Sequence, residues 1–163
     1  MQYIIEKVTK SEKKEILPIY ISSIGEEGCT WDEEYPNMKT IEDDINSEGL
    51  YCLKINNSIV GIATLIKEKN IYDEFKEFKN ACLLTRVGID KKYQGKGYAK
   101  ILLKSILENA IKQKIDLIYL LVNKNNIKAK KLYNFFNFEF CRIVNEHGRE
   151  WELLIKQLFY KGE

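Results

Sequence analysis

The chain has 163 residues, of which 45% are hydrophobic and 31% charged, and its formal net charge is +2. This length suits a single domain, 1–163, built around one core. No apolar run approaches the roughly 20 residues that a membrane-spanning helix needs, and residues 1–7 lack the pattern of a signal peptide. The cysteines are far apart and form no C-x-x-C pair, which favours free thiols in a cytoplasmic protein without a metal: Cys29, Cys52, Cys82 and Cys141.

The charges are unevenly distributed along the chain. Residues 24–48 are rich in Asp and Glu and contain one base, Lys39, whereas residues 91–131 are rich in Lys and contain two acids, Glu108 and Asp116. The basic segment suits a polyanionic ligand and the acidic segment suits a cation. Each segment also suits a solvated helix face, so charge alone leaves the choice open.

The N-terminal third predicts a strand followed by two helices. Ser11 is a candidate helix cap, and the apolar residues after it repeat at helical spacing, with Pro18 in the first turn or at a bend. Thr40 is the expected cap of the second, shorter helix. The expected strand, first helix, loop and second helix cover 1–8, 16–24, 31–37 and 41–46.

A β-hairpin comes next, with arms at 50–55 and 58–67 that meet at Asn56-Asn57, a pair that tolerates the positive φ of a tight turn. Gly61 within the second arm predicts a bulge or a close approach by another group. Residues 81–89 predict a strand that is too apolar for the edge of a sheet.

The second half predicts helix, strand, helix and two closing strands. Apolar residues at i, i+3, i+4 and i+7 from Ala99 to Ala110 predict a helix with one buried face, and residues 117–122 predict a strand. Asn126 is the expected cap of the next helix and Asn137 its left-handed end. The closing strands are expected at 138–144 and 151–158. The order predicts an α/β fold: a mixed, mostly antiparallel sheet with a central parallel strand pair and helices on both faces.

The stretch from Val87 to Lys104 joins a strand to a helix through Gln94-Gly95-Lys96-Gly97, which is an arrangement suited to binding an anion. A P-loop does not fit, because Asp90 stands at its first glycine position and Gly97 where it needs Ser or Thr. A dinucleotide fingerprint does not fit either, because Lys100 stands where a third small residue is needed.

Two spaced motifs instead resemble the GCN5-related N-acetyltransferases. Gln94-x-x-Gly97-x-Ala99 is similar to the pyrophosphate-binding turn of that family, and Arg86-Val-Gly-Ile89 is similar to the strand end before it. The run Asn126-x-x-Ala129-x-x-Leu132-Tyr133 followed by Phe136-Asn137-Phe138 is similar to the second conserved block, with Asn137 in place of the usual glycine. The resemblance implies the acyl-CoA N-acyltransferase fold.

The same resemblance implies that acetyl-CoA is the co-substrate, without a metal. Main-chain amides of the turn would hold the pyrophosphate, lysines at 91–92 and 128–131 the 3′-phosphate, and the end of the strand the pantetheine arm. Tyr133 would be the general acid, because a phenol of pKa about 10 stays protonated until the thiolate leaves. The implied cofactor-binding residues are Val87, Gly88, Ile89, Gln94, Gly95, Lys96, Gly97, Tyr98, Ala99, Lys100 and Asn126.

In this family the acceptor wall is usually built by the region that is acidic here, 24–48. Trp31, Glu34 and Tyr35 are therefore the expected acceptor-binding residues, and they suit a cationic amine such as a polyamine, an amino sugar or a peptide N-terminus. A general base is not identified. Candidates by loop position are Glu33, Glu34, Asp73 and Glu74; His147, in an expected hairpin turn, is not assigned a role.

Two other functions remain open. The chain is expected to be an acetyl-CoA-dependent N-acetyltransferase, but a module that binds acyl-CoA without turnover would keep the same cleft. A nucleic-acid-binding domain would use the lysine-rich half, yet Lys96, Lys100 and Lys104 form a row without interleaved aromatic residues on a helix otherwise devoted to the core. The expected partners are a small-molecule or peptide amine, with neither nucleic acid nor membrane, and the expected state is a monomer or homodimer.

Overall fold

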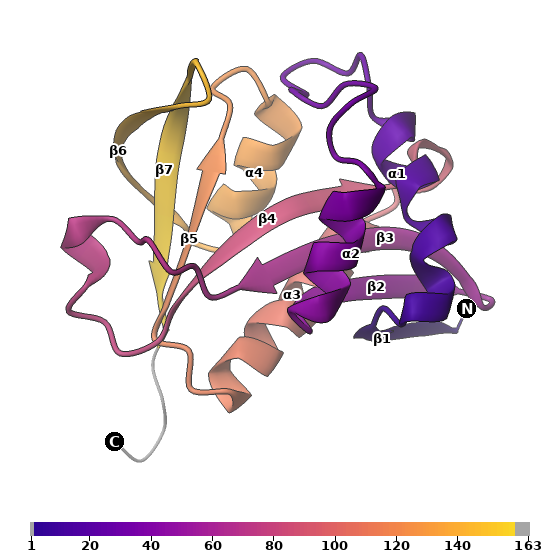
Figure 1. Ribbon diagram of the computed structural model, residues 1–163, viewed down its shortest axis with the longest axis horizontal. Coiled ribbons are helices and arrows are strands. Elements are labelled where there is room, and N and C mark those ends of the chain that lie inside the picture. Colours follow the sequence, from indigo (N-terminus) through magenta and orange to yellow (C-terminus); the bar gives the residue numbers. More distant parts are fainter. Residues whose placement is uncertain (1, 159–163) are drawn as a thin grey trace.

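In a computed structural model, which describes residues 2–158, a seven-stranded sheet organises the chain in the order β1-β2-β3-β4-β5-β7-β6 (Figure 1). Met1 and residues 159–163 of the expected domain lie outside the described residues. Among the described strands, β4 and β5 form the one parallel pair, which confirms the predicted mixed sheet. The strands are β1 (Tyr3–Lys7), β2 (Leu50–Ile55), β3 (Ser58–Ile66), β4 (Ala81–Ile89), β5 (Leu117–Val122), β6 (Glu139–Glu146) and β7 (Arg149–Gln157).

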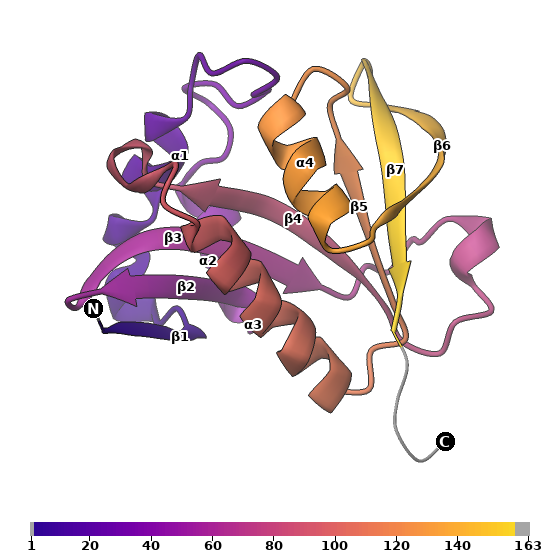
Figure 2. The same ribbon diagram turned by 180° about the vertical axis from the view of Figure 1, so that it is seen from behind.

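Helices cover both faces of the sheet, as predicted. Helices α1 and α2 lie on one face (Figure 1), and α3 and α4 lie on the other (Figure 2). The helices are α1 (Leu17–Ser22), α2 (Met38–Asn46), α3 (Tyr98–Lys112) and α4 (Ile127–Phe135), and short 3-10 turns stand at η1 (Lys10–Glu15), η2 (Asp73–Phe75) and η3 (Lys91–Tyr93).

The two faces of the sheet carry separate parts of the core. The apolar stripe of α3, which includes Leu102, Leu103 and Ile106, is fully buried against the side chains that β2, β3 and β4 direct to that face. On the opposite face, Tyr20 of α1 and Ile41 of α2 are buried with residues of β2 and β3. This double covering explains why the central strands are apolar on both sides.

Local features in the hairpin follow the sequence. Asn56 and Asn57 both have positive φ, 49° and 68°, which confirms the tight turn between β2 and β3. A side chain at Gly61 would place Cβ 2.6 Å from Cδ1 of Ile89, and the β2–β3 register shifts nearby, so both a bulge and a close approach are present. Asn137 is left-handed, with φ 64°, as predicted for the end of α4.

Two predicted helix starts were wrong by a few residues. Thr9, not Ser11, precedes the first helical turn, and its backbone N–H donates to Oε1 of Glu12 at 2.9 Å. Asn37, not Thr40, caps α2: Oδ1 of Asn37 accepts from the N–H of Thr40 at 3.1 Å, and Oγ1 of Thr40 accepts from the N–H of Asn37 at 3.3 Å. Because this exchange places Thr40 inside the first turn, the helix begins three residues earlier than predicted.

The strands β4 and β5 pair at their start and then separate. Their ladder joins Ala81–Leu83 to Leu117–Tyr119, and beyond it β4 continues to Ile89 beside β3 alone. Within this free part β4 carries a bulge, because Thr85 pairs with Thr64 and Gly88 pairs with Ile62, which leaves two residues of β4 opposite one of β3. The parted strands leave a V-shaped gap in the middle of the sheet.

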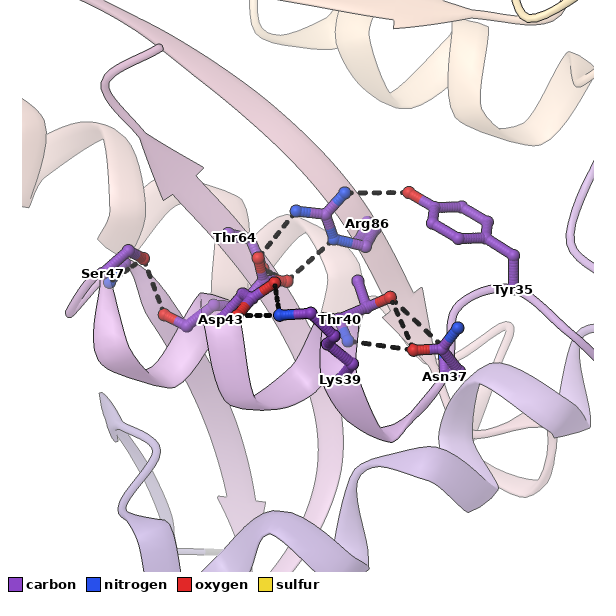
Figure 3. A network of polar contacts seen from close by, with 10 residues as sticks. Tyr35, Asn37, Lys39, Thr40, Asp43, Ser47, Thr64 and Arg86 are labelled. Atoms are coloured by element: carbon purple, nitrogen blue, oxygen red, sulfur yellow. Dashed lines mark hydrogen bonds and ion pairs between the residues drawn. The ribbon is translucent and has the colours of Figure 1, made fainter. Parts of the chain in front are cut away.

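The bulge is secured by an ion pair from Arg86, whose φ is +50°. Its Nε and Nη2 atoms donate to the two carboxylate oxygens of Asp44 at 2.8 and 2.7 Å, and Asp44 is 3% exposed. Thr64 also donates to Asp44, at 3.0 Å, and Nη1 of Arg86 donates to the hydroxyl of Tyr35 at 2.9 Å (Figure 3). These contacts join α2, β3, β4 and the loop that contains Tyr35.

We predict that Asp44→Ala lowers the free energy of unfolding by about 3–5 kcal/mol, because it leaves the guanidinium of Arg86 partly buried without its counter-charge. Urea unfolding measures the effect. The matched control is Asp43→Ala, which removes the exposed i,i+4 pair with Lys39 at 3.2 Å and should change stability by about 0.5 kcal/mol or less. Equal destabilisation by the two variants would contradict this role of Asp44.

Candidate active site

A cavity of about 1450 Å³ opens where β4 and β5 separate. Its walls include the free end of β4 and the turn after it, the end of β5, the first turns of α3 and α4, the loop 26–31, and the β6–β7 hairpin. The free end of β4 contributes Val87, Gly88 and Ile89, the residues that the sequence predicts to bind the pantetheine arm. Since β5 does not pair with this part of β4, its backbone has room for an added extended ligand.

The first turn of α3 faces this cavity without a side chain that caps it. Gly97 precedes the helix with φ +84°, and Gly95 has φ +78°. A Cβ built on either glycine meets nothing within 4 Å, so the space in front of the helix is open. The first amides of a 15-residue helix therefore point into an open space where an anion fits.

The turn before α3 is held by its own side chains. Gln94 donates from Nε2 to the carbonyl of Ile89 at 3.0 Å, and Asp90 accepts from the N–H of Lys92 at 3.0 Å. The N–H of Asp90 in turn donates to the carbonyl of Val60 at 2.8 Å. The side chain of Gln94 thus fixes the turn to the end of β4, which leaves ligand contact to main-chain amides.

Lysines surround the same opening. Lys91, Lys100, Lys128 and Lys131 line the cavity, whereas Lys96 extends over the ring of Tyr93, 5.6 Å from its centroid. The cavity-lining lysines come from both α3 and α4 and from the turn between β4 and α3. They give the open end of the cleft a positive charge suited to phosphates.

Tyr133 of α4 lies in the cleft wall with its side chain buried. Its ring packs against Phe138, with 5.7 Å between centroids, and its hydroxyl has no hydrogen-bond partner among residues 2–158. Burial raises the pKa of the Tyr133 phenol, so the proton is retained across neutral pH.

Asn126 caps α4 through its Oδ1, which accepts from the N–H of Ala129 at 3.2 Å, so its amide nitrogen is the group left for a ligand.

The expected acceptor residues separate into two groups. Trp31 and Tyr35 line the cavity, but Glu34 does not: it is exposed, and its N–H donates to Oδ1 of Asp32 at 2.8 Å. Tyr35 is held by Arg86, and Trp31 packs edge-on against Tyr20 with 5.1 Å between centroids.

The carboxylates that line the cavity are not those predicted from the sequence as candidate bases. They are Glu26, Glu27, Glu68 and Glu146. None of the base candidates Glu33, Glu34, Asp73 and Glu74 is among the described lining residues; Glu74 pairs with Arg142 at 2.7 Å and Asp73 with Lys76 at 2.7 Å. Glu26 and Glu27 lie in the acidic segment that suggested a cation site, whereas Glu68 and Glu146 reach the cavity only through the tertiary fold. His147 lines the cavity beside Glu146.

Comparison with known proteins decides the family. The family model described as "Acetyltransferase (GNAT) family" matches residues 16–138. The chain belongs to this family. The match includes β4, the glycine turn, α3 and α4, whereas the β6–β7 hairpin of the cavity wall lies beyond it.

Two curated relatives match part of this GNAT chain. A "Spermine/spermidine N(1)-acetyltransferase" of Bacillus subtilis (strain 168) is 37% identical, and a "Probable spermine N(1)-acetyltransferase" of Bacillus subtilis subsp. natto is 38% identical. Each match covers 89 residues, 53% of this chain and 56% of the relative, so the chain spans about half the length of the curated relatives it matches.

The solved structures show the fold. The ribosomal-protein-S18-alanine N-acetyltransferase of Escherichia coli superposes with a TM-score of 0.78 at 17% identity over 99% of this chain and 97% of that chain. The yncA protein of Salmonella typhimurium, solved with its cofactor acetyl-CoA, superposes with a TM-score of 0.77 at 16% identity over 100% of this chain and 98% of that chain. In the part of this GNAT chain that the structure describes, no helix is long and apolar enough to cross a membrane, and no three His, Cys, Asp or Glu side chains gather as metal ligands.

We predict that Gly97→Val weakens coenzyme A binding by about tenfold or more, because branched side-chain atoms then occupy the space in front of the α3 amides. Isothermal titration calorimetry measures the dissociation constant. Gly25→Val is the matched control, since Gly25 also has positive φ, 91°, with nothing within 4 Å of its added Cβ, but is not among the described residues that line the cavity. Equal weakening by both variants would show that backbone strain, not the α3 site, controls binding.

Proposed function

We propose that the chain transfers an acetyl group from acetyl-CoA to a primary amine of a small polycation of the polyamine class. The observation that carries this proposal is one cavity that joins an open, glycine-flanked helix start to a buried, unpartnered tyrosine and to several carboxylates. Family membership and the names of the curated relatives support it.

The donor side of the cavity fits acetyl-CoA. The pyrophosphate fits the open space before α3, where Gly95 and Gly97 present no side chain. Lys91, Lys128 and Lys131 supply charge for the remaining phosphate. The pantetheine arm fits beside Val87–Ile89, where a main-chain amide would also stabilise negative charge on the thioester oxygen.

This arrangement supports direct attack of the acceptor amine on the thioester of acetyl-CoA. The neutral amine nitrogen forms a bond to the thioester carbonyl carbon, and the carbon–sulfur bond then breaks. The sulfur takes its proton from the hydroxyl of Tyr133, which burial keeps protonated. The proton lost by the amine returns to the Tyr133 phenolate through solvent, so the enzyme is restored.

The acceptor side suits a cation. Glu26 and Glu27 line the cavity from the loop after α1, Glu68 from the segment after β3, and Glu146 from the end of β6. Trp31, Tyr35 and Trp151 supply aromatic surface beside them, and ammonium groups bind both carboxylates and aromatic faces.

An amine panel with acetyl-CoA and a thiol-release assay tests the proposal: spermidine and spermine should react faster than neutral amines of similar length. Equal rates would contradict a cationic acceptor, and binding of acetyl-CoA without thiol release would favour the non-catalytic module.

We predict that Tyr133→Phe lowers kcat by about 10² while coenzyme A affinity is retained, because a positioned general acid contributes about 10²–10⁴ in rate. The free energy of unfolding should be nearly unchanged, since the Tyr133 hydroxyl has no hydrogen-bond partner in the described chain. Tyr119→Phe is the matched control, because Tyr119 is a buried tyrosine outside the cavity lining. A kcat loss shared by both variants would remove the proposed role of Tyr133.

The pH dependence of kcat gives a separate prediction. Tyr133 acts only in its protonated form, and burial raises its pKa above the ordinary value near 10. At saturating acceptor we therefore expect no loss of kcat on the alkaline side up to about pH 10. A decline between pH 7 and 9 in protein shown to be folded at those pH values would contradict Tyr133 as the acid.

A further inference from the structure

The loop segment Gly28–Trp31 touches both arms of the V-shaped cleft. At one end, Gly28 lies against the backbone that follows β5. A Cβ built on Gly28 would lie 2.3 Å from the nitrogen and 2.4 Å from the Cα of Asn126, and 2.6 Å from the carbonyl carbon of Asn125. Only a residue without a side chain permits this approach, and the φ of Gly28, +77°, also favours glycine.

At the other end of the segment, Trp31 lies against β4. Two ring atoms of Trp31 would be 3.4 and 3.5 Å from a Cβ built on Gly88, in the part of β4 that has no β5 partner. The ring of Tyr20 packs edge-on against the ring of Trp31, with an angle of 78° between the ring planes. The segment therefore spans from the end of β5 to the free part of β4, and Figure 1 shows the loop between α1 and α2 extending toward the start of α4.

We propose that Gly28–Trp31 is a bridge that sets the width of the passage between donor and acceptor, and that Gly28 is the position that fixes it. The inference rests on the proposed function. The passage is closed at one end by the β4–β5 ladder, which stops at Leu83 and Tyr119, and at the other end by the bridge. Three peptide steps extend at most about 10 Å, so the arms cannot separate further while both contacts hold. A passage closed on both sides admits a slender, unbranched primary amine in preference to a ring or a folded chain terminus.

When the contact between Gly28 and Asn126 is disturbed, the bridge moves and the start of α4 stays in place. Asn126 is held by its cap to Ala129, by its N–H to the carbonyl of Asn123 at 2.9 Å, and by the N–H of Lys130 to its own carbonyl at 3.0 Å. Around Gly28, the N–H of Cys29 bonds only locally, to the carbonyl of Glu26 at 3.0 Å. A methyl group at Gly28 therefore displaces the loop and widens the passage, while the α4 start keeps its geometry.

Gly28→Ala tests this role against Gly25→Ala, a control in the same loop. Gly25 also has positive φ, +91°, but its added Cβ meets nothing within 4 Å, so the two variants share the backbone strain and differ in the contact. For Gly28→Ala we expect the KM for spermidine to rise about tenfold, equivalent to about 1.4 kcal/mol. The coenzyme A dissociation constant should stay within about twofold, and the rate with glucosamine relative to spermidine should increase. Gly25→Ala should change none of these.

Hydrogen–deuterium exchange without substrates tests the bridge independently of activity. Peptides that cover 26–31 should exchange faster in Gly28→Ala than in Gly25→Ala, at equal free energy of unfolding. Equal exchange in the two variants, or an unchanged KM for spermidine in Gly28→Ala, overturns the proposal. A loss of coenzyme A affinity in Gly28→Ala as large as the rise in KM for spermidine also overturns it. If the wild-type protein acetylates no amine, the proposed function fails and acceptor selection with it, and exchange alone then supports or overturns the bridge.

Discussion

The separation of β4 from β5 is the constraint on which the rest of the structure depends. Two parallel strands in the middle of a sheet would normally pair along their length, and here they pair only over their first residues. Main-chain groups that would otherwise join the ladder are left beside a cavity. Helices α3 and α4 follow the free ends of β4 and β5 on the same face of the sheet (Figure 2), and residues of both first turns line the cavity. The cleft therefore results from the order and direction of the strands, and the side chains determine only the chemistry of its lining.

Keeping the strands apart requires support on the face that carries α1 and α2. The bulge in β4 turns Arg86 toward Asp44, and this pair joins α2 to the strand at the point where it leaves β5. Tyr35 extends the network to the loop between α1 and α2 (Figure 3). The two ends of the segment 28–31 then rest on opposite arms of the gap. The contacts that stabilise the fold thus also hold the wall of the cavity, which explains why charged residues are partly buried at its edge.

Sequence reasoning succeeded where local chemistry decides structure. The glycine turn before α3, the Asn56-Asn57 hairpin and the left-handed Asn137 follow from backbone preferences of single residues, and the structure has all three. Helix starts were less certain, because Thr40 and Asn37 are both good caps and only their reciprocal bonds decide between them. The carboxylates at 68 and 146 had no local signal, since they reach the cavity from strand ends far apart in the chain. The contact of Gly28 with Asn126 had no local signal either, because it depends on the tertiary fold.

The central claim is that main-chain amides at the start of α3 and the free end of β4 hold coenzyme A. An NMR titration of the ¹⁵N-labelled protein with coenzyme A tests it residue by residue. The account predicts that the amide signals of Gly95–Lys100 and Val87–Ile89 shift most, while those of β1 and β2 remain in place. Saturable binding that leaves the α3 signals unchanged, or the absence of any shift at millimolar coenzyme A, would contradict it.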